Sequence, residues 1–160
     1  KLDEENKVVR LADLAEPERS HLANIPCTSF DTEPWVTGPP LAERRIAMIS
    51  TAALQHRDDT PFLIGTGDYR YIADDTPASD LVMAHISTNF DRSGFEQDLN
   101  VVLPLDRMHE LAEAGEIGSV GRFHYAFMGS TDPVQMETAA RAMAGHLKAD
   151  GVDSCILLPV

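Results

Sequence analysis

The sequence predicts an α/β fold, with an open, mostly parallel sheet flanked by helices in Rossmann-like or flavodoxin-like layers. Three observations predict it. Short apolar runs typical of buried strands recur along the chain. Two intervening stretches have the apolar periodicity of helices. The chain closes with a helix, a glycine and an apolar strand, which is the order of the second half of a βαβ unit.

Residues 1–40 are expected to form an N-terminal arm, followed by one α/β domain at 41–160 that lacks its C-terminal part. The stretch from Leu11 to Leu22 fits a short helix if Pro17 sits at a boundary. Four prolines surround Trp35 between residues 26 and 40, which predicts an extended segment that wraps over a surface.

Five segments of the domain have the composition of strands. The first, Ile46–Ile49, is an apolar run that follows charged residues and suits a buried strand. The others are expected at residues 69–72, 81–86, 123–128 and 155–158. The last of these is apolar enough for a central position in the sheet.

Two helices are expected between these strands, and each has start and stop signals. One begins near Pro104 and ends before Gly115. The other has Asp132 as its N-cap, runs to about Lys148 and is stopped by Gly151.

Composition excludes several classes of protein. The 160 residues carry a formal net charge of −13, which argues against binding to nucleic acid. Two cysteines are too few for a disulfide framework, and no apolar run approaches the roughly 20 residues of a membrane span. We therefore expect a cytoplasmic protein without a membrane or nucleic-acid partner.

The densest group of polar side chains lies between His85 and Asp106. A histidine at a strand end, followed by Asp91 in a loop, suits a general acid–base pair in which the carboxylate orients the imidazole. The same groups are ordinary metal ligands, although their spacing matches no fixed metal signature. Asp91 can equally cap a turn, which leaves a purely structural role open.

His124 lies in a predicted strand beside Tyr125, so the two side chains point to opposite faces of the sheet. The histidine is then either a hydrogen-bonded core residue or a group in a cleft. Cys155 is interpreted as an inert core thiol. A nucleophile elbow of the GxSxG type is absent, and residues 65–68 are too short for a dinucleotide fingerprint.

The ordered motifs resemble the selenoprotein B family of glycine, sarcosine, betaine and D-proline reductases. The resemblance covers about Pro39 to Val160. Its most specific motifs are HISTNFDR at residues 85–92 and DLNVVLPLDR at residues 98–107. Supporting motifs are PLAERRIAMISTAAL at 40–54, DTPF at 59–62, GDYRYI at 67–72, EIGSV at 116–120 and HYAFMG at 124–129.

The resemblance implies reductive cleavage of a carbon–nitrogen bond α to a carboxylate. In the family a selenocysteine or cysteine attacks the α-carbon, and a nearby thiol resolves the adduct. That reactive pair is expected just after Val160, where this chain departs from the family pattern by ending. This chain alone is then expected to be inactive, with no cofactor of its own. Its implied partners are a small amino-acid-like substrate, a thioredoxin-type thiol reductant and other reductase subunits. A second copy of the chain is a further candidate partner, because the proline-rich arm with Trp35 needs a surface to cover, either its own or a neighbour's.

Within this hypothesis, His85 and His124 transfer protons or orient the substrate, and Asp91 is their partner carboxylate. Thr51, Asp68 and Arg70 are expected to line the pocket, with Arg70 binding the substrate carboxylate. Two alternatives remain open. One is a ligand-binding or regulatory domain without redox chemistry. The other is a metal-dependent enzyme that uses His85, Asp91 and His124.

Overall fold

The computed structural model describes residues 10–26, 28–29, 31–86 and 92–160. The chain divides into two compact units, Lys1–Glu33 and Pro34–Val160. The first unit contains the 3-10 turn η2 (Leu11–Asp13) and the helix α1 (Glu16–Ala23). Pro17 sits in the first turn of α1, where its missing N–H costs nothing. The predicted short helix therefore forms, and it begins at Glu16, one residue before the proline.

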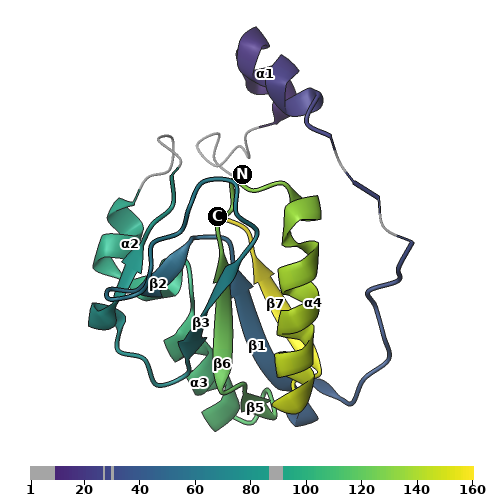
Figure 1. The fold of residues 1–160 in the computed structure, drawn as a ribbon. Helices are drawn as coiled ribbons and strands as arrows, with labels where there is room; N and C mark the ends of the chain where they lie inside the picture. The colour runs from purple at the N-terminus through teal and green to yellow at the C-terminus, as the bar shows by residue number, and fades with distance from the viewer. Residues whose placement is uncertain (1–9, 27, 30, 87–91) are drawn as a thin grey trace, which may run out of the picture. The chain divides into compact units, whose positions relative to one another are not determined.

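The second unit is built around a mostly parallel sheet of five strands (Figure 1). The central strand β1 pairs in parallel with β5 and β6 along one side and with β7 along the other. β3 adds to β6 in the antiparallel direction. The bounds are β1 Arg45–Ser50, β3 Tyr69–Ala73, β5 Ser119–Val120, β6 Phe123–Phe127 and β7 Ser154–Leu158.

Helices cover both faces of this sheet. α4 (Pro133–Ala149) lies on one face and α3 (Leu105–Glu113) on the other (Figure 1). The short helix α2 (Ser93–Gln97) and a separate antiparallel pair, β2 (Leu54–His56) with β4 (Leu81–Met83), complete the unit. Three 3-10 turns connect these elements: η3 Leu41–Glu43, η4 Ala78–Asp80 and η5 Leu99–Val101.

The helix signals in the sequence act as expected. The Asp132 carboxylate accepts a hydrogen bond from the Val134 N–H at 3.0 Å and caps α4. Gly115 after α3 and Gly151 after α4 have φ of +73° and +74°. Glycine adopts this left-handed conformation without the steric cost of a Cβ, so each residue ends its helix cleanly.

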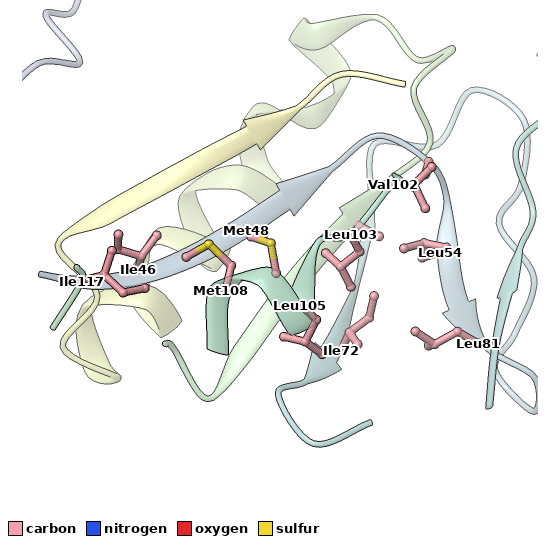
Figure 2. Close-up of a cluster of buried hydrophobic side chains, with 12 residues drawn as sticks. Ile46, Met48, Leu54, Ile72, Leu81, Val102, Leu103, Leu105, Met108 and Ile117 are labelled. Atoms are coloured by element: carbon pink, nitrogen blue, oxygen red, sulfur yellow. The ribbon is translucent and has the colours of Figure 1, made fainter. Parts of the chain in front are cut away.

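The main sheet packs a cluster of buried side chains on each face, because side chains alternate along its strands, and a third, smaller cluster comprises Ala53, Phe62 and Met128. Ile46 and Met48 of β1 face α3 and pack with Ile72, Leu105 and Met108 (Figure 2). On the other face, Ala47 and Tyr125 pack with Phe127, Met143 and Leu147 under α4. Burial on both faces explains why β1 and β6 read as nearly continuous apolar runs.

The predicted fold class is confirmed, and three details differ. β7 was expected in the centre of the sheet, but in the described residues it pairs with β1 alone. Its side chains are accordingly accessible: Leu157 is 69% exposed, and Cys155 is exposed rather than a core thiol. The run 81–86 gives a strand of three residues, because its end turns away at Ala84 to bond Ala53.

Across the described residues, none of the helices combines the length and apolarity that crossing a bilayer requires.

Ile72 of β3 is fully buried in the core on the α3 face of the sheet, and we expect the stability of the sheet to depend on it. The substitution Ile72→Ala should lower the free energy of unfolding by about 2–5 kcal/mol, because it removes buried methyl groups and leaves a cavity. Val101 is 62% exposed, so Val101→Ala should change it by less than about 0.5 kcal/mol. Urea titrations of both variants measure this difference, and equal midpoints would refute the assignment of Ile72 to the core.

Candidate functional site

The candidate site lies at the carboxyl ends of the parallel strands, where ligands bind in open α/β sheets. Thr51 follows β1 and joins its end to that of β7. The Thr51 N–H donates to the Leu158 carbonyl at 3.0 Å. Its hydroxyl accepts from the Val160 N–H at 2.8 Å and contacts the Val160 carbonyl at 3.3 Å. Residue 160 is therefore held at a fixed place at this edge of the sheet.

His85 lies at the same edge, packed against the turn that follows β6. The histidine is only 5% exposed. The Gly129 N–H donates to the Thr51 carbonyl at 3.0 Å. A Cβ on Gly129 would stand 3.0 Å from His85 Nε2 and 2.9 Å from the Thr51 oxygen. Only glycine leaves room for this approach, so His85, Thr51 and Gly129 form one tightly packed group.

Ala53 holds the three loops of this edge together in a strained conformation. Its φ is +52°, in the left-handed region that costs a residue with a Cβ about 1 kcal/mol or more. The Ala53 N–H donates to the Phe127 carbonyl at 2.9 Å, and its carbonyl accepts from the Ala84 N–H at 3.0 Å. The ends of β1, β6 and β4 are thereby tied together, which places His85, next to Ala84, beside Thr51.

The electrostatic setting of His85 favours the neutral imidazole. Burial lowers the pKa of His85 below its usual 6.5, and the nearby positive charge of Arg92 lowers it further. The Arg92 guanidinium also donates to the backbone carbonyl of His85. A buried, neutral histidine at neutral pH can accept a proton, which suits a general base.

Asp68 and Arg70 lie at the same edge, because β3 runs antiparallel to β6 and pairs Tyr69 with Phe127. Arg70 Nη1 donates to the Asp68 carboxylate at 2.7 Å, and Arg70 Nη2 donates to the Thr60 carbonyl at 2.9 Å. Burial acts to raise the pKa of Asp68, but hydrogen bonds from Arg70 and Thr66 outweigh it and lower the pKa. The two predicted pocket residues therefore form an ion pair.

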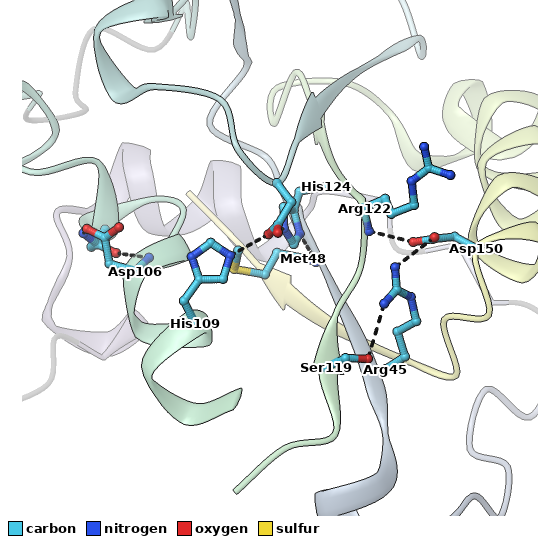
Figure 3. A network of polar contacts seen from close by, with 10 residues as sticks. Arg45, Met48, Asp106, His109, Ser119, Arg122, His124 and Asp150 are labelled. Carbon is cyan, nitrogen blue, oxygen red and sulfur yellow. Dashed lines mark hydrogen bonds and ion pairs between the residues drawn. The ribbon is translucent and has the colours of Figure 1, made fainter. Parts of the chain in front are cut away.

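His124 lies inside the sheet rather than at its edge. Its Nδ1 accepts from the Met48 N–H at 3.0 Å (Figure 3). The ring thus fills a gap in the hydrogen bonding along β1, between the part of β1 that pairs with β5 and the part that pairs with β6. Nδ1 therefore carries no proton, and the neutral ring has its proton on Nε2. Nε2 lies 3.3 Å from Asp74 Oδ1, which His109 Nε2 also contacts at 2.8 Å.

Burial is the main cause that lowers the pKa of His124, and it outweighs the opposing effect of Asp74. Along the strand, His124 is five residues from Gly129, about 16 Å at the usual rise per residue. The structure thus brings His85 and Thr51 together, places Asp68 and Arg70 at the same edge, and sets His124 apart. Asp91 lies outside the described residues.

The three proposed metal ligands are not seen together, because His85 and His124 are separated and Asp91 is not described. Among the residues that the structure describes, no group of three or more His, Cys, Asp or Glu side chains is arranged to hold a metal ion. Ala53 and Gly129 were not among the site residues predicted from the sequence. Gly129 ends an apolar strand run, and that signal alone does not reveal the close approach of His85.

Comparison with known proteins identifies a family. The profile described as "Glycine/sarcosine/betaine reductase selenoprotein B (GRDB)" matches residues 68–159, more than half of the chain. The chain belongs to this family. The match includes His85, Asp68, Arg70 and Gly129, and it ends at the strand that leads to Val160. No solved structure is significantly similar.

Three curated relatives are named as subunits of reductases. The chain is 27% identical to the D-proline reductase subunit gamma of Acetoanaerobium sticklandii over 76% of this chain and 54% of the relative. It is 29% identical to the glycine reductase complex component B subunit gamma of Symbiobacterium thermophilum, over 86% of this chain and 33% of that relative. It is 32% identical to the betaine reductase complex component B subunit beta of Peptoclostridium acidaminophilum, over 45% of this chain and 17% of that relative. The chain thus spans about half the length of the first relative and a third or less of the others.

Gly129 offers a direct test of the packing at the site. We expect Gly129→Ala to displace His85 and to change the pKa of its imidazole, because the new methyl group would press against Nε2. A Cβ on Gly145 in α4 would meet nothing within 4 Å, so Gly145→Ala is the matched control. Histidine side-chain NMR titrations measure both variants. An unchanged His85 titration in Gly129→Ala would contradict the contact.

His124 should make stability depend on pH. Because its folded-state pKa lies below the unfolded value of about 6.5, the unfolded chain binds more protons as the pH falls below 6.5. The contribution of His124 to the free energy of unfolding is therefore fully present above pH 6.5. Below that pH the free energy of unfolding decreases by up to about 1.4 kcal/mol per pH unit because of this group. His124→Asn retains an acceptor for the Met48 N–H but cannot titrate, so it should show a shallower decline in urea titrations between pH 8 and 5. An equal slope would exclude His124 as the cause.

Proposed function

We propose that this chain is the scaffold and proton-handling part of a reductase that cleaves a carbon–nitrogen bond α to a carboxylate. The substrates are glycine, sarcosine, betaine or D-proline and similar compounds. The observation that carries the proposal is the anchoring of Val160 by Thr51 beside His85 and Gly129. Membership of the family supports the reaction class.

In this proposal a selenocysteine or cysteine follows Val160 and supplies the nucleophile for the α-carbon. The residues of this chain suit such a group. Thr51 holds both the N–H and the carbonyl of Val160, so the next residue starts from a fixed position. His85 is buried and neutral at the same edge, where it can accept the proton of a selenol or thiol.

The ion pair between Asp68 and Arg70 is proposed to hold the substrate. A zwitterionic amino acid carries a carboxylate that matches the Arg70 guanidinium and an amine that matches Asp68. Substrate binding then exchanges the internal ion pair for two new ones, while the contact of Arg70 with the Thr60 carbonyl keeps the guanidinium in place. Phe62, whose ring centroid lies 4.4 Å from the Arg70 guanidinium carbon, fixes its plane.

Electrons for the reaction are proposed to come from a thioredoxin-type dithiol. The nucleophile displaces the amine and forms a bond to the α-carbon. A second thiol then attacks the selenium or sulfur atom of this adduct, whose bond to carbon breaks. The carbon leaves with the bonding electron pair and takes up the proton of that thiol, and the two chalcogen atoms remain as an oxidised pair. The dithiol returns that pair to the reduced state. Other subunits of a reductase complex are the proposed partners, as the names of the relatives suggest.

The test uses a form of the chain extended past Val160 by the reactive selenocysteine or cysteine and its resolving cysteine, supplied with dithiothreitol and each candidate substrate. We expect His85→Gln to lower kcat by about 10²–10⁴-fold, as for loss of a general base. His56 is the last residue of β2, at the end of that strand farther from Ala53, and has no role in the proposed site, so His56→Gln is the control variant with unchanged kcat. Equal turnover of His85→Gln and the parent would remove His85 from the mechanism.

The same enzyme should lose activity in acid. Because the pKa of His85 is lowered from 6.5, its base form is present at neutral pH and disappears only below that value. We expect a plot of log(kcat/KM) against pH to fall on the acid side below pH 6.5.

Substrate binding without any reduction by the extended chain would favour a ligand-binding domain instead.

A further inference from the structure

The outer side of β7 is the most unusual surface of the sheet. Its strand, Ser154–Leu158, contains one small polar residue and four apolar ones, and the described residues place no strand along that side. Ile156 is 36% exposed and Leu157 is 69% exposed. In Figure 1, β7 lies beside β1 on the side away from β6.

The other edge of the sheet is protected differently. β3 contains Arg70, begins next to Asp68 and is followed directly by Asp74 and Asp75. Charged residues at an edge disfavour pairing with another strand. β7 has no charged residue and no proline within its bounds. The two edges of one sheet therefore differ, and β7 has the character of a strand that is paired.

The backbone of β7 determines how another strand can pair with it. The Leu158 carbonyl accepts from the Thr51 N–H and so points toward β1. Backbone groups alternate along a strand, so the N–H and C=O groups of Cys155 and Leu157 point to the open side. These two residues lie symmetrically on either side of Ile156.

This arrangement is self-complementary. In an antiparallel pair about a twofold axis, Cys155 of each copy would lie opposite Leu157 of the other copy. Each of these two residue pairs exchanges two backbone hydrogen bonds, which gives four in total. Shifted registers satisfy fewer groups. A shift toward Pro159 meets a residue without an N–H, and a shift toward Asp153 meets an N–H that already donates to the Arg45 carbonyl at 3.1 Å.

We propose that β7 pairs with β7 of a second copy of this chain, antiparallel and centred on Ile156, to form one continuous sheet. The side chains support this pairing on both faces. Ile156 lies beside Met48 on the α3 face and would contact its own counterpart across the axis. Leu157 lies beside Ile49 on the α4 face, next to a cavity of about 460 Å³ that Trp35 and Val36 also line. The partner strand covers these exposed apolar groups.

Sedimentation equilibrium of the 160-residue chain tests the association. We expect a reversible dimer that Leu157→Asp shifts to monomer, because a charge would be buried in the new pairing. Tyr71 is 63% exposed on the opposite edge strand, so Tyr71→Asp is the control and should leave the dimer intact. A monomer at all concentrations, or a dimer that Leu157→Asp does not weaken, would overturn the proposal.

Disulfide trapping tests the register. In a chain with Cys27→Ser and Cys155→Ser, Ile156→Cys places two thiols opposite each other at the non-hydrogen-bonded position, where the side chains are closest. We expect rapid oxidation to a covalent dimer. Ser154→Cys in the same background should not cross-link, because residue 154 faces Leu158 of the other copy. Cross-linking through residue 154, or none through residue 156, contradicts the centred register.

Discussion

The structure depends on the need to pair every backbone group of β1. This strand has helices over both faces and strands along both sides, and Ala47, Met48 and Ser50 are fully buried. A buried N–H without a partner costs about as much as a lost hydrogen bond. The ladder to β5 and β6 is interrupted at Met48, where the ring of His124 accepts the N–H instead. A side chain thus completes the central strand.

The same constraint shapes the candidate site where β1 ends. Beyond Ser50 the regular ladder ends. The Thr51 and Ala53 N–H groups still donate to strand carbonyls, and nearby side chains supply further partners. Ser50 Oγ accepts from the Ala52 N–H at 3.2 Å and donates to the Val102 carbonyl at 3.0 Å, and Thr51 Oγ1 binds Val160. Ala53 remains strained because it joins three loops. Polar side chains therefore gather at this edge for structural reasons, and the same side chains include the candidate site residues Thr51 and His85.

Much of the architecture could be predicted from local patterns in the sequence. α4 has a capping aspartate, a proline in its first turn and a terminal glycine, and β1 is an uninterrupted apolar run, so both were recognised. The edge position of β7 in the described residues could not be predicted in this way, because its apolar composition is typical of a strand in the centre of a sheet. The three-residue strand β2 was too short to give a pattern.

The candidate site was predictable in part. The position of Thr51 and His85 at strand ends pointed to one edge of the sheet, and the structure places both there. The place of His124 depends on its hydrogen bond with the Met48 N–H, a residue 76 positions away in sequence, so no local pattern reveals it. The closeness of Gly129 to His85 is likewise a tertiary contact. The ion pair between Asp68 and Arg70 is local, since only one residue, at the start of β3, separates the two, but its place at this edge depends on the pairing of β3 with β6. Residue types identified candidates for chemistry, and the packing determined which of them meet.

The most direct test of the site is the reactivity of one cysteine added after Val160, in a chain where Cys27 and Cys155 are replaced by serine. Its alkylation by iodoacetamide at pH 7 reports how much thiolate is present. If Thr51 directs this residue toward His85, His85→Gln should slow alkylation by about tenfold or more, because the proton acceptor is lost. Equal rates with and without His85 would contradict the proposal that this edge of the sheet is the site of proton transfer.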